Sequence, residues 1–142
     1  KVLSLNKSLV RVSNSIRNRS SVLQCEDIPI NLHICSYGGS VFSGFAAVDY
    51  IAENKVPVHS YIDGCAASAA TLMSVVAEKR FMHKRSFMLI HQLSSGMWGN
   101  YEALKDSMEN CTIVCRHWIR FLSYYISYVL DISLTHTFPY MC

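Results

Sequence analysis

The sequence has little proline, no Cys-x-x-Cys pair and no long uninterrupted apolar run. Only three of the 142 residues are proline and six are glycine, so no proline-rich or glycine-rich linker divides the chain. Residues 118–134 are the most apolar stretch, but Arg120 and Asp131 interrupt it, and it falls short of the roughly 20 apolar residues that span a membrane. We therefore expect a single folded domain without membrane contact.

The first 24 residues contain no aspartate or glutamate. They carry five Lys and Arg side chains and a charge of +5, whereas the rest of the chain has 8 basic and 10 acidic residues and a charge of −2. The folded part is therefore not expected to bind nucleic acid. A basic, serine-rich segment is typical of a transit peptide. We favour an amphipathic helix, because apolar side chains recur at loosely helical spacing at Leu3, Leu5, Leu9, Val10, Val12 and Ile16.

The six cysteines are scattered through apolar surroundings and lack the framework of a small secreted domain. Reduced thiols in a cytoplasmic protein are the expected state. Cys111 and Cys115 have the i, i+4 spacing of one helical face, and His117 is near them, but three ligands are one short of a structural zinc site. We favour ordinary helix packing there and expect neither metal nor cofactor.

From residue 28 onward, strand and helix patterns alternate. Period-two or short apolar runs predict strands, whereas 3.6-residue periodicity predicts helices. Strands are predicted at 28–35, 58–62 and 86–90, with a shorter candidate at 80–82; helices are predicted at 41–54, at 65–77 and from 101 into the 120s. Asp63-Gly64 is expected to end the second strand. This alternation predicts an α/β fold with parallel strands.

Three chemically suggestive segments follow predicted strands. The Gly38-Gly39 turn, the Gly64–Ser68 turn and His91 should meet at one edge of the sheet, where ligands bind in parallel α/β folds. Ser68 is a candidate nucleophile and His91 a candidate base. Taken alone, each has an ordinary structural interpretation: a small residue in an alanine-rich helix, a strand-end histidine and a glycine turn.

Together, the segments SYGGSVFSG, GCAASAA and MLIHQ, in that order, resemble the proteolytic subunits of the Clp protease family. Their detail is most similar to bacteriophage members, and the resemblance spans residues 28 to about 110. It implies a ClpP/crotonase-like α/β fold of repeated β-β-α and βαβ units, with a mostly parallel sheet and a protruding handle helix. The chain then divides into a divergent basic segment (1–24), a catalytic core (25–115) and a divergent apolar tail (116–142).

The resemblance also implies roles for individual residues. Ser68 would attack the peptide carbonyl, and His91 would act as base and then as acid. Backbone N–H groups of Gly39 and Ala69 would form the oxyanion hole. The peptide-binding residues would be Gly38, Ser40 and Val41 on one side and Ser94, Ser95 and Gly96 on the other.

Implied partners are other copies of the chain in a ring built on heptamers, an AAA+ ATPase unfoldase and an unfolded polypeptide substrate. The family's third catalytic residue is an acid downstream of the histidine. Asp131 is the only acid after Cys115, and its surroundings do not match, so we leave the acid unassigned.

Three alternatives stay open. The first is a catalytically impaired structural subunit of such a ring. The second is an acyl-CoA enzyme of the related crotonase fold, and the third is a serine–lysine hydrolase that uses Lys79 or Lys84. The motif around His91 favours the serine–histidine peptidase over the last two.

Overall fold

The structure is a computed structural model that describes the backbone of residues 1–133 and the side chains of residues 1–125. The chain forms two compact units, Lys1–Ile90 and His91–Cys142. Each unit is described below by itself.

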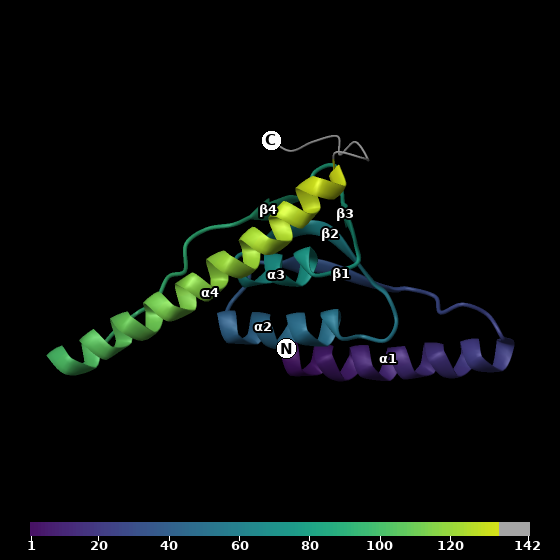
Figure 1. The fold of residues 1–142 in the computed structure, drawn as a ribbon, viewed down its shortest axis with the longest axis horizontal. Coiled ribbons are helices and arrows are strands. Elements are labelled where there is room, and N and C mark those ends of the chain that lie inside the picture. Colours follow the sequence, from purple (N-terminus) through teal and green to yellow (C-terminus); the bar gives the residue numbers. More distant parts are fainter. Residues whose placement is uncertain (134–142) are drawn as a thin grey trace. The chain divides into compact units, whose positions relative to one another are not determined.

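The first unit begins with the helix expected from the N-terminal apolar spacing. Helix α1 spans Val2–Leu23 and ends at Gln24, which adopts a left-handed conformation. Its buried stripe mixes Leu9 with polar residues, and the Asn6 side-chain amide donates a hydrogen bond of 3.2 Å to the carbonyl of Ala46 in helix α2 (Val41–Ala52). Side by side in Figure 1, the two helices form the outer layer of this unit.

A four-stranded parallel sheet forms the centre of the first unit. Strand β2 (Val58–Ala67) lies between β1 (Ile30–Ser36) on one side and β3 (Lys79–Met82) and β4 (Phe87–Leu89) on the other. The first half of β2 pairs with β3 and the second half pairs with β4, and every pairing is parallel. The predicted parallel α/β sheet is therefore confirmed.

The prediction for Asp63-Gly64 was wrong. These residues do not end β2; they form an irregularity within it, because the partner of Ile34 is Ile62 whereas the partner of Ser36 is Ala66. A bulge of this kind keeps the strand paired while bending it. The helix expected at 65–77 is consequently shorter, with α3 spanning Ala69–Val75.

Within the first unit, α1, α2 and α3 lie on one side of the sheet and create the core there (Figure 1). Ile34 and Ile62 from the strands pack with Ala66 and with Ala70 of α3, all nearly inaccessible to solvent. A neighbouring cluster joins α1, α2 and β2 through Leu9, Ile51 and Val58. Side chains alternate between the two faces of a strand, so the intervening residues of β1 and β2 point to the other face.

That other face carries a row of stacked rings. His33 of β1 stacks on Tyr61 of β2 with ring centroids 5.1 Å apart, and Tyr61 stacks on Phe81 of β3 at 4.6 Å. Farther along β2, the Asp63 carboxylate lies 3.0 Å from His33 Nδ1 and 3.2 Å from His83 Nε2. Cross-strand pairs of this kind stabilise neighbouring strands.

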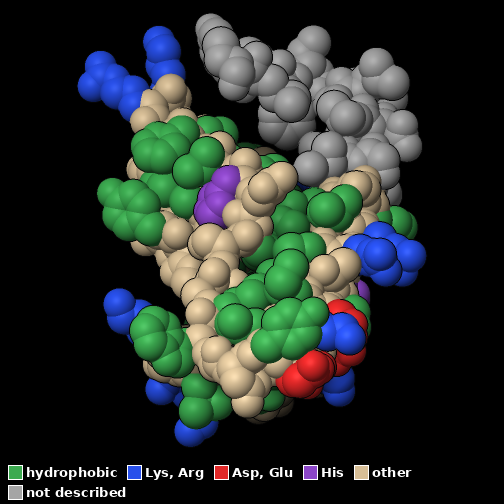
Figure 2. Space-filling view, turned by 90° about the vertical axis from the view of Figure 1, so that its left-hand side faces the viewer, with side chains coloured by type: hydrophobic (Ala, Val, Ile, Leu, Met, Phe, Trp, Pro, Cys, Tyr) green, Lys and Arg blue, Asp and Glu red, His purple; other side chains and the backbone are tan. Residues whose placement is uncertain are grey.

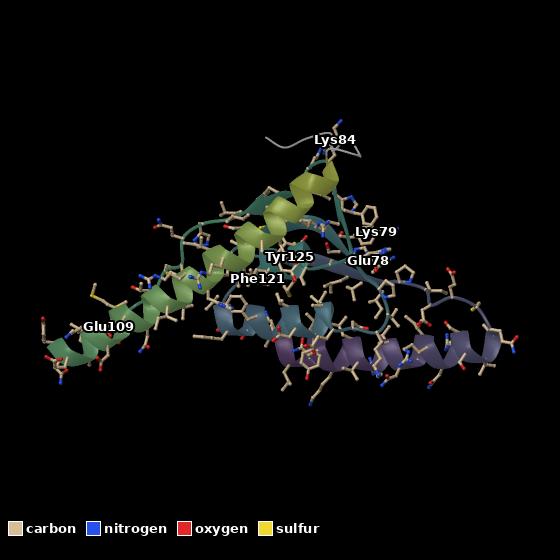
Figure 3. The ribbon with its side chains drawn as sticks, in the orientation of Figure 1. Glu78, Lys79, Lys84, Glu109, Phe121 and Tyr125 are labelled. Carbon is tan, nitrogen blue, oxygen red and sulfur yellow. The ribbon has the colours of Figure 1, made fainter. Side chains whose placement is uncertain are left out.

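The second unit is dominated by one helix, α4, which spans Tyr101–Ser133 and confirms the long helix predicted from residue 101. Asn100 caps it, because its side-chain oxygen accepts a 3.0 Å hydrogen bond from the Ala103 N–H. Farther along, the rings of Phe121 and Tyr125 lie 4.6 Å apart (Figure 3). Within the described residues, no helix is long and apolar enough to cross a membrane.

We expect the core around β2 to dominate the stability of the first unit. Ile62 is 2% exposed, and Ile62→Ala should lower the free energy of unfolding by about 2–5 kcal/mol, because the cavity cannot close fully. Ile28, which is 70% exposed, provides the matched control, and Ile28→Ala should cost about 0.5 kcal/mol or less. Urea denaturation of both variants measures the difference, and equal losses would contradict this description of the core.

Candidate functional site

Ser68 lies at a sharp junction between a strand and a helix. Strand β2 ends at Ala67, α3 begins at Ala69, and Ser68 between them has φ 53° and ψ −129°. The sequence predicted Ser68 inside the helix; the structure instead places it just before the helix, with a positive φ. A positive φ is uncommon for a residue other than glycine. Such strain is concentrated at functional sites, where surrounding contacts hold it in place.

Backbone hydrogen bonds hold this junction on both sides. The Ser68 N–H donates to the carbonyl of Leu89 in β4 at 2.8 Å. The Ser68 carbonyl accepts bonds from the Thr71 N–H at 2.9 Å and from the Thr71 hydroxyl at 2.7 Å. The serine is therefore fixed by the neighbouring strand and by the first turn of α3, while its side chain stays partly exposed.

The Gly38 backbone lies directly against Ser68. Gly38 has φ 92°, and a Cβ atom added there would lie 2.6 Å from the Ala67 carbonyl oxygen, 2.9 Å from Ser68 Cβ and 3.0 Å from the Ala69 nitrogen. Both the conformation and the lack of space therefore require glycine at this position. The turn after β1 and the serine junction after β2, far apart in the sequence, meet at one end of the sheet as predicted.

The rest of the turn leads into α2. The Ser36 hydroxyl accepts a 3.1 Å hydrogen bond from the Gly38 N–H, and the Ser40 hydroxyl accepts one of 3.5 Å from the Ser43 N–H. Gly39 has φ 148°, and nothing lies within 4 Å of the position that its Cβ would occupy. Val41 is the first residue of the helix. This turn is thus fixed at both ends and open around Gly39.

The remaining predicted site residues belong to the second unit. His91 is exposed, and its Nδ1 lies 2.6 Å from the carbonyl oxygen of Gln92. With its ring proton on Nδ1, His91 donates this hydrogen bond and keeps Nε2 as an acceptor. Ser94, Ser95 and Gly96 follow in an exposed loop, where the Ser95 hydroxyl donates to the Gly96 carbonyl at 3.5 Å.

Large apolar side chains are also exposed. Figure 2 shows one face of the molecule on which hydrophobic side chains predominate and several Lys and Arg side chains project at the margins. Among the most exposed aromatic residues are Tyr37 and Phe42, on either side of the Gly38-Gly39 turn, at 85% and 69%. The Gly38-Gly39 turn is therefore flanked by exposed aromatic side chains.

Other candidate groups are less favourably placed. Lys79 pairs in register with His59 at the beginning of β2, whereas Ser68 follows the end of that strand. At about 3.3 Å per strand residue, the two are more than 20 Å apart, so they do not form a serine–lysine pair. Lys84 is exposed before β4 (Figure 3). The Asp131 side chain lies outside the described residues, and no cluster of three His, Cys, Asp or Glu residues within the described part could hold a metal ion.

The sequence did not reveal the positive φ of Ser68 or the close approach of Gly38. One signal was present: the two residues before Ser68 and the two after it are all alanine. Small neighbours permit another backbone to approach closely. They do not by themselves specify a backbone angle.

Comparisons with known proteins agree with this geometry. Residues 6–125 match the family model described as Clp protease, which extends on both sides of the segments that carry the motifs. Two curated relatives are each called ATP-dependent Clp protease proteolytic subunit 2, from Treponema pallidum and Treponema denticola. Each is 42% identical over 73 residues. Those residues make up 50% of this chain but only 37% and 36% of the relatives.

A solved structure, a mutant of ClpP1 from Listeria monocytogenes, has a similar fold. The two structures superpose with a TM-score of 0.64 at 22% sequence identity. The superposed region covers 84% of this chain and 66% of the ClpP1 chain. Together with the parallel sheet, this similarity confirms the predicted α/β fold of the ClpP type.

Gly38→Ala should disrupt the serine junction. The new Cβ would clash with the backbone around Ser68 and would require a strained φ, so we expect a loss of about 2 kcal/mol or more in the free energy of unfolding. Gly96→Ala is the control, because nothing lies within 4 Å of its added Cβ. Urea denaturation compares the two, and an unchanged midpoint for Gly38→Ala would show that the turn does not press on Ser68.

Proposed function

Because the chain belongs to the Clp protease family, we propose that it is a subunit of a serine endopeptidase that hydrolyses unfolded polypeptides inside an oligomeric chamber. The observation that carries the proposal is Ser68, held with a strained positive φ at a strand–helix junction with Gly38 against it. A merely structural serine in an alanine-rich helix would have no reason to adopt this strained backbone.

In the proposed reaction, Ser68 Oγ attacks the carbonyl carbon of the scissile peptide bond while His91 Nε2 accepts the hydroxyl proton. The resulting tetrahedral intermediate collapses, its C–N bond breaks, and His91 delivers the proton to the departing amine. Water then attacks the acyl-enzyme by the reverse sequence of proton transfers and releases Ser68. No cofactor takes part in any of these steps.

The oxyanion of the intermediate needs hydrogen-bond donors that are already in place. We assign this role to the backbone N–H groups of Gly39 and Ala69. Two observations support the assignment. A Cβ atom added at Gly38 would lie 3.0 Å from the Ala69 nitrogen, and the space beside Gly39 is open. The turn therefore puts its backbone next to the first residue of α3.

We propose that the substrate binds as an extended strand. Gly38, Ser40 and Val41 would contact it on one side and residues 94–96 on the other, so that backbone hydrogen bonds supply affinity with little sequence preference. Such a mode suits an enzyme whose substrates are unfolded chains of many sequences.

The group that accepts a hydrogen bond from His91 Nδ1 affects the expected rate. In the structure this group is the Gln92 carbonyl, a neutral acceptor that can orient the ring. A carboxylate at this position would also stabilise the protonated imidazole. We therefore expect slower turnover than a complete Ser-His-Asp triad would give.

The proposal includes an assembly. Copies of the chain would form a heptamer-based ring in which α4 serves as the handle between rings, and an AAA+ ATPase would deliver unfolded substrate. We propose the cytoplasm as its compartment, where the cysteines would stay reduced.

Replacing the nucleophile tests the chemistry. Ser68→Ala should lower cleavage of a short fluorogenic peptide by at least about 1,000-fold, and it should abolish labelling by a fluorophosphonate probe. His91→Ala should have a comparable effect on cleavage. Ser21→Ala is the matched control on the exposed surface of α1 and should leave both signals unchanged. Cleavage that survives Ser68→Ala would exclude Ser68 as the nucleophile.

Assembly is measured on the same samples. Light scattering should show a ring whose mass is a multiple of seven chains, for the parent protein and for Ser68→Ala alike. A ring of that mass that neither cleaves peptide nor reacts with the fluorophosphonate would support the impaired structural subunit in place of the peptidase.

A further inference from the structure

Helix α4 carries two cysteines that the proposed chemistry does not use. Cys111 and Cys115 are four residues apart, so they lie one above the other on the same face of the helix. Both are partly exposed and neither forms a disulfide. Their placement depends only on the geometry of one helix.

The two thiols are neighbours on one face of α4. Burial raises the pKa of the Cys115 thiol, and the hydrogen bond that this thiol donates to Cys111 and the electrostatic interaction with Cys111 raise that pKa further. The i, i+4 spacing itself places the two sulfur atoms on the same side of α4, so that both can reach one ligand.

Helical geometry decides which ligand suits the pair. Side chains four residues apart have Cβ atoms about 5–6 Å apart, whereas a disulfide needs about 3.5–4.5 Å. A disulfide would therefore require the helix to distort. A bridging ion with metal–sulfur bonds of about 2.3 Å spans up to about 4.6 Å between the sulfurs, which leaves the helix intact.

The neighbouring side chains favour a soft ion. Met108 lies one turn before Cys111, adds a thioether sulfur to the same face and is 62% exposed. The residues one turn after Cys115 are Trp118 and Ile119, which bring no oxygen ligand. Thiolate and thioether ligands select ions such as Cu(I), while carboxylate-rich sites select hard ions.

We propose that Cys111 and Cys115 form a binding site for a single thiophilic, low-coordination metal ion of the Cu(I) type. Binding replaces two S–H bonds with two metal–sulfur bonds and releases two protons to solvent. No electron is transferred. The site does not depend on the peptidase activity proposed above.

The experiment is an anaerobic competition for Cu(I) between the full chain and a chromophoric bicinchoninate chelator. The parent for this test carries Cys25→Ser, Cys35→Ser and Cys142→Ser, so that other accessible thiols do not contribute. We expect one Cu(I) per chain, and at least tenfold weaker binding after either Cys111→Ser or Cys115→Ser. Equal binding by the parent and these two variants would overturn the proposal.

A spacing control separates a built site from two independent thiols. Combining Cys115→Ser with Ile113→Cys keeps the number of thiols but places them two residues apart, on opposite sides of the helix. Ile113 is 62% exposed, so the helix should tolerate the change, and circular dichroism checks that it does. This variant should also bind at least tenfold more weakly; unchanged binding would overturn the proposal.

A second probe reports the same geometry without copper. Phenylarsine oxide condenses with two nearby thiols, forming two arsenic–sulfur bonds and releasing one water. Trypsin cleaves after Lys105 and Arg116, so the fragment of residues 106–116 contains Cys111 and Cys115 and no other cysteine. Mass spectrometry should find one phenylarsenic group on this fragment from the native protein. If this fragment carries no phenylarsenic group and the serine variants bind copper as tightly as the parent, the proposal of a site at Cys111 and Cys115 is overturned.

Discussion

The first unit depends on the close approach of two backbones at the end of the sheet. Gly38 can lie against Ser68 only because it has no side chain. Ser68 can keep its positive φ because β4 and α3 fix its N–H and carbonyl groups. The sheet order follows from the same arrangement, since β4 must pair with the second half of β2 for Leu89 to reach Ser68. Local strain is thus balanced by hydrogen bonds from two separate elements.

Much of this architecture could be predicted from the sequence, because its elements obey simple periodicities. The parallel strands, α1, α2 and the beginning of α4 follow from apolar spacing and from turn residues. The order of three motifs identified the family and placed the Gly38-Gly39 turn beside Ser68. These inferences needed only local patterns and the rule that parallel strands share their carboxyl ends.

Other features depend on contacts that no local pattern encodes. Asp63-Gly64 is typical of a turn, yet pairing with β1 and β4 on either side carries β2 through it as a bulge. Ser68 is flanked by alanines that favour a helix, yet the backbone bond to Leu89 and the approach of Gly38 hold it in another conformation. In both places tertiary hydrogen bonding outweighs local propensity, which is common at functional sites.

The bulge in β2 also restricts how this part of the chain can change in length. Between Ile34 and Ser36, β1 advances by two residues, while β2 advances by four, from Ile62 to Ala66. The surplus is two, an even number, so Ala66 points into the same core as Ile62. Removing one residue would turn the end of β2 over and direct Ala66 away from this core. A change of one residue before Ser68 would therefore cost this core contact, whereas a change of two would keep Ala66 on the same face as Ile62.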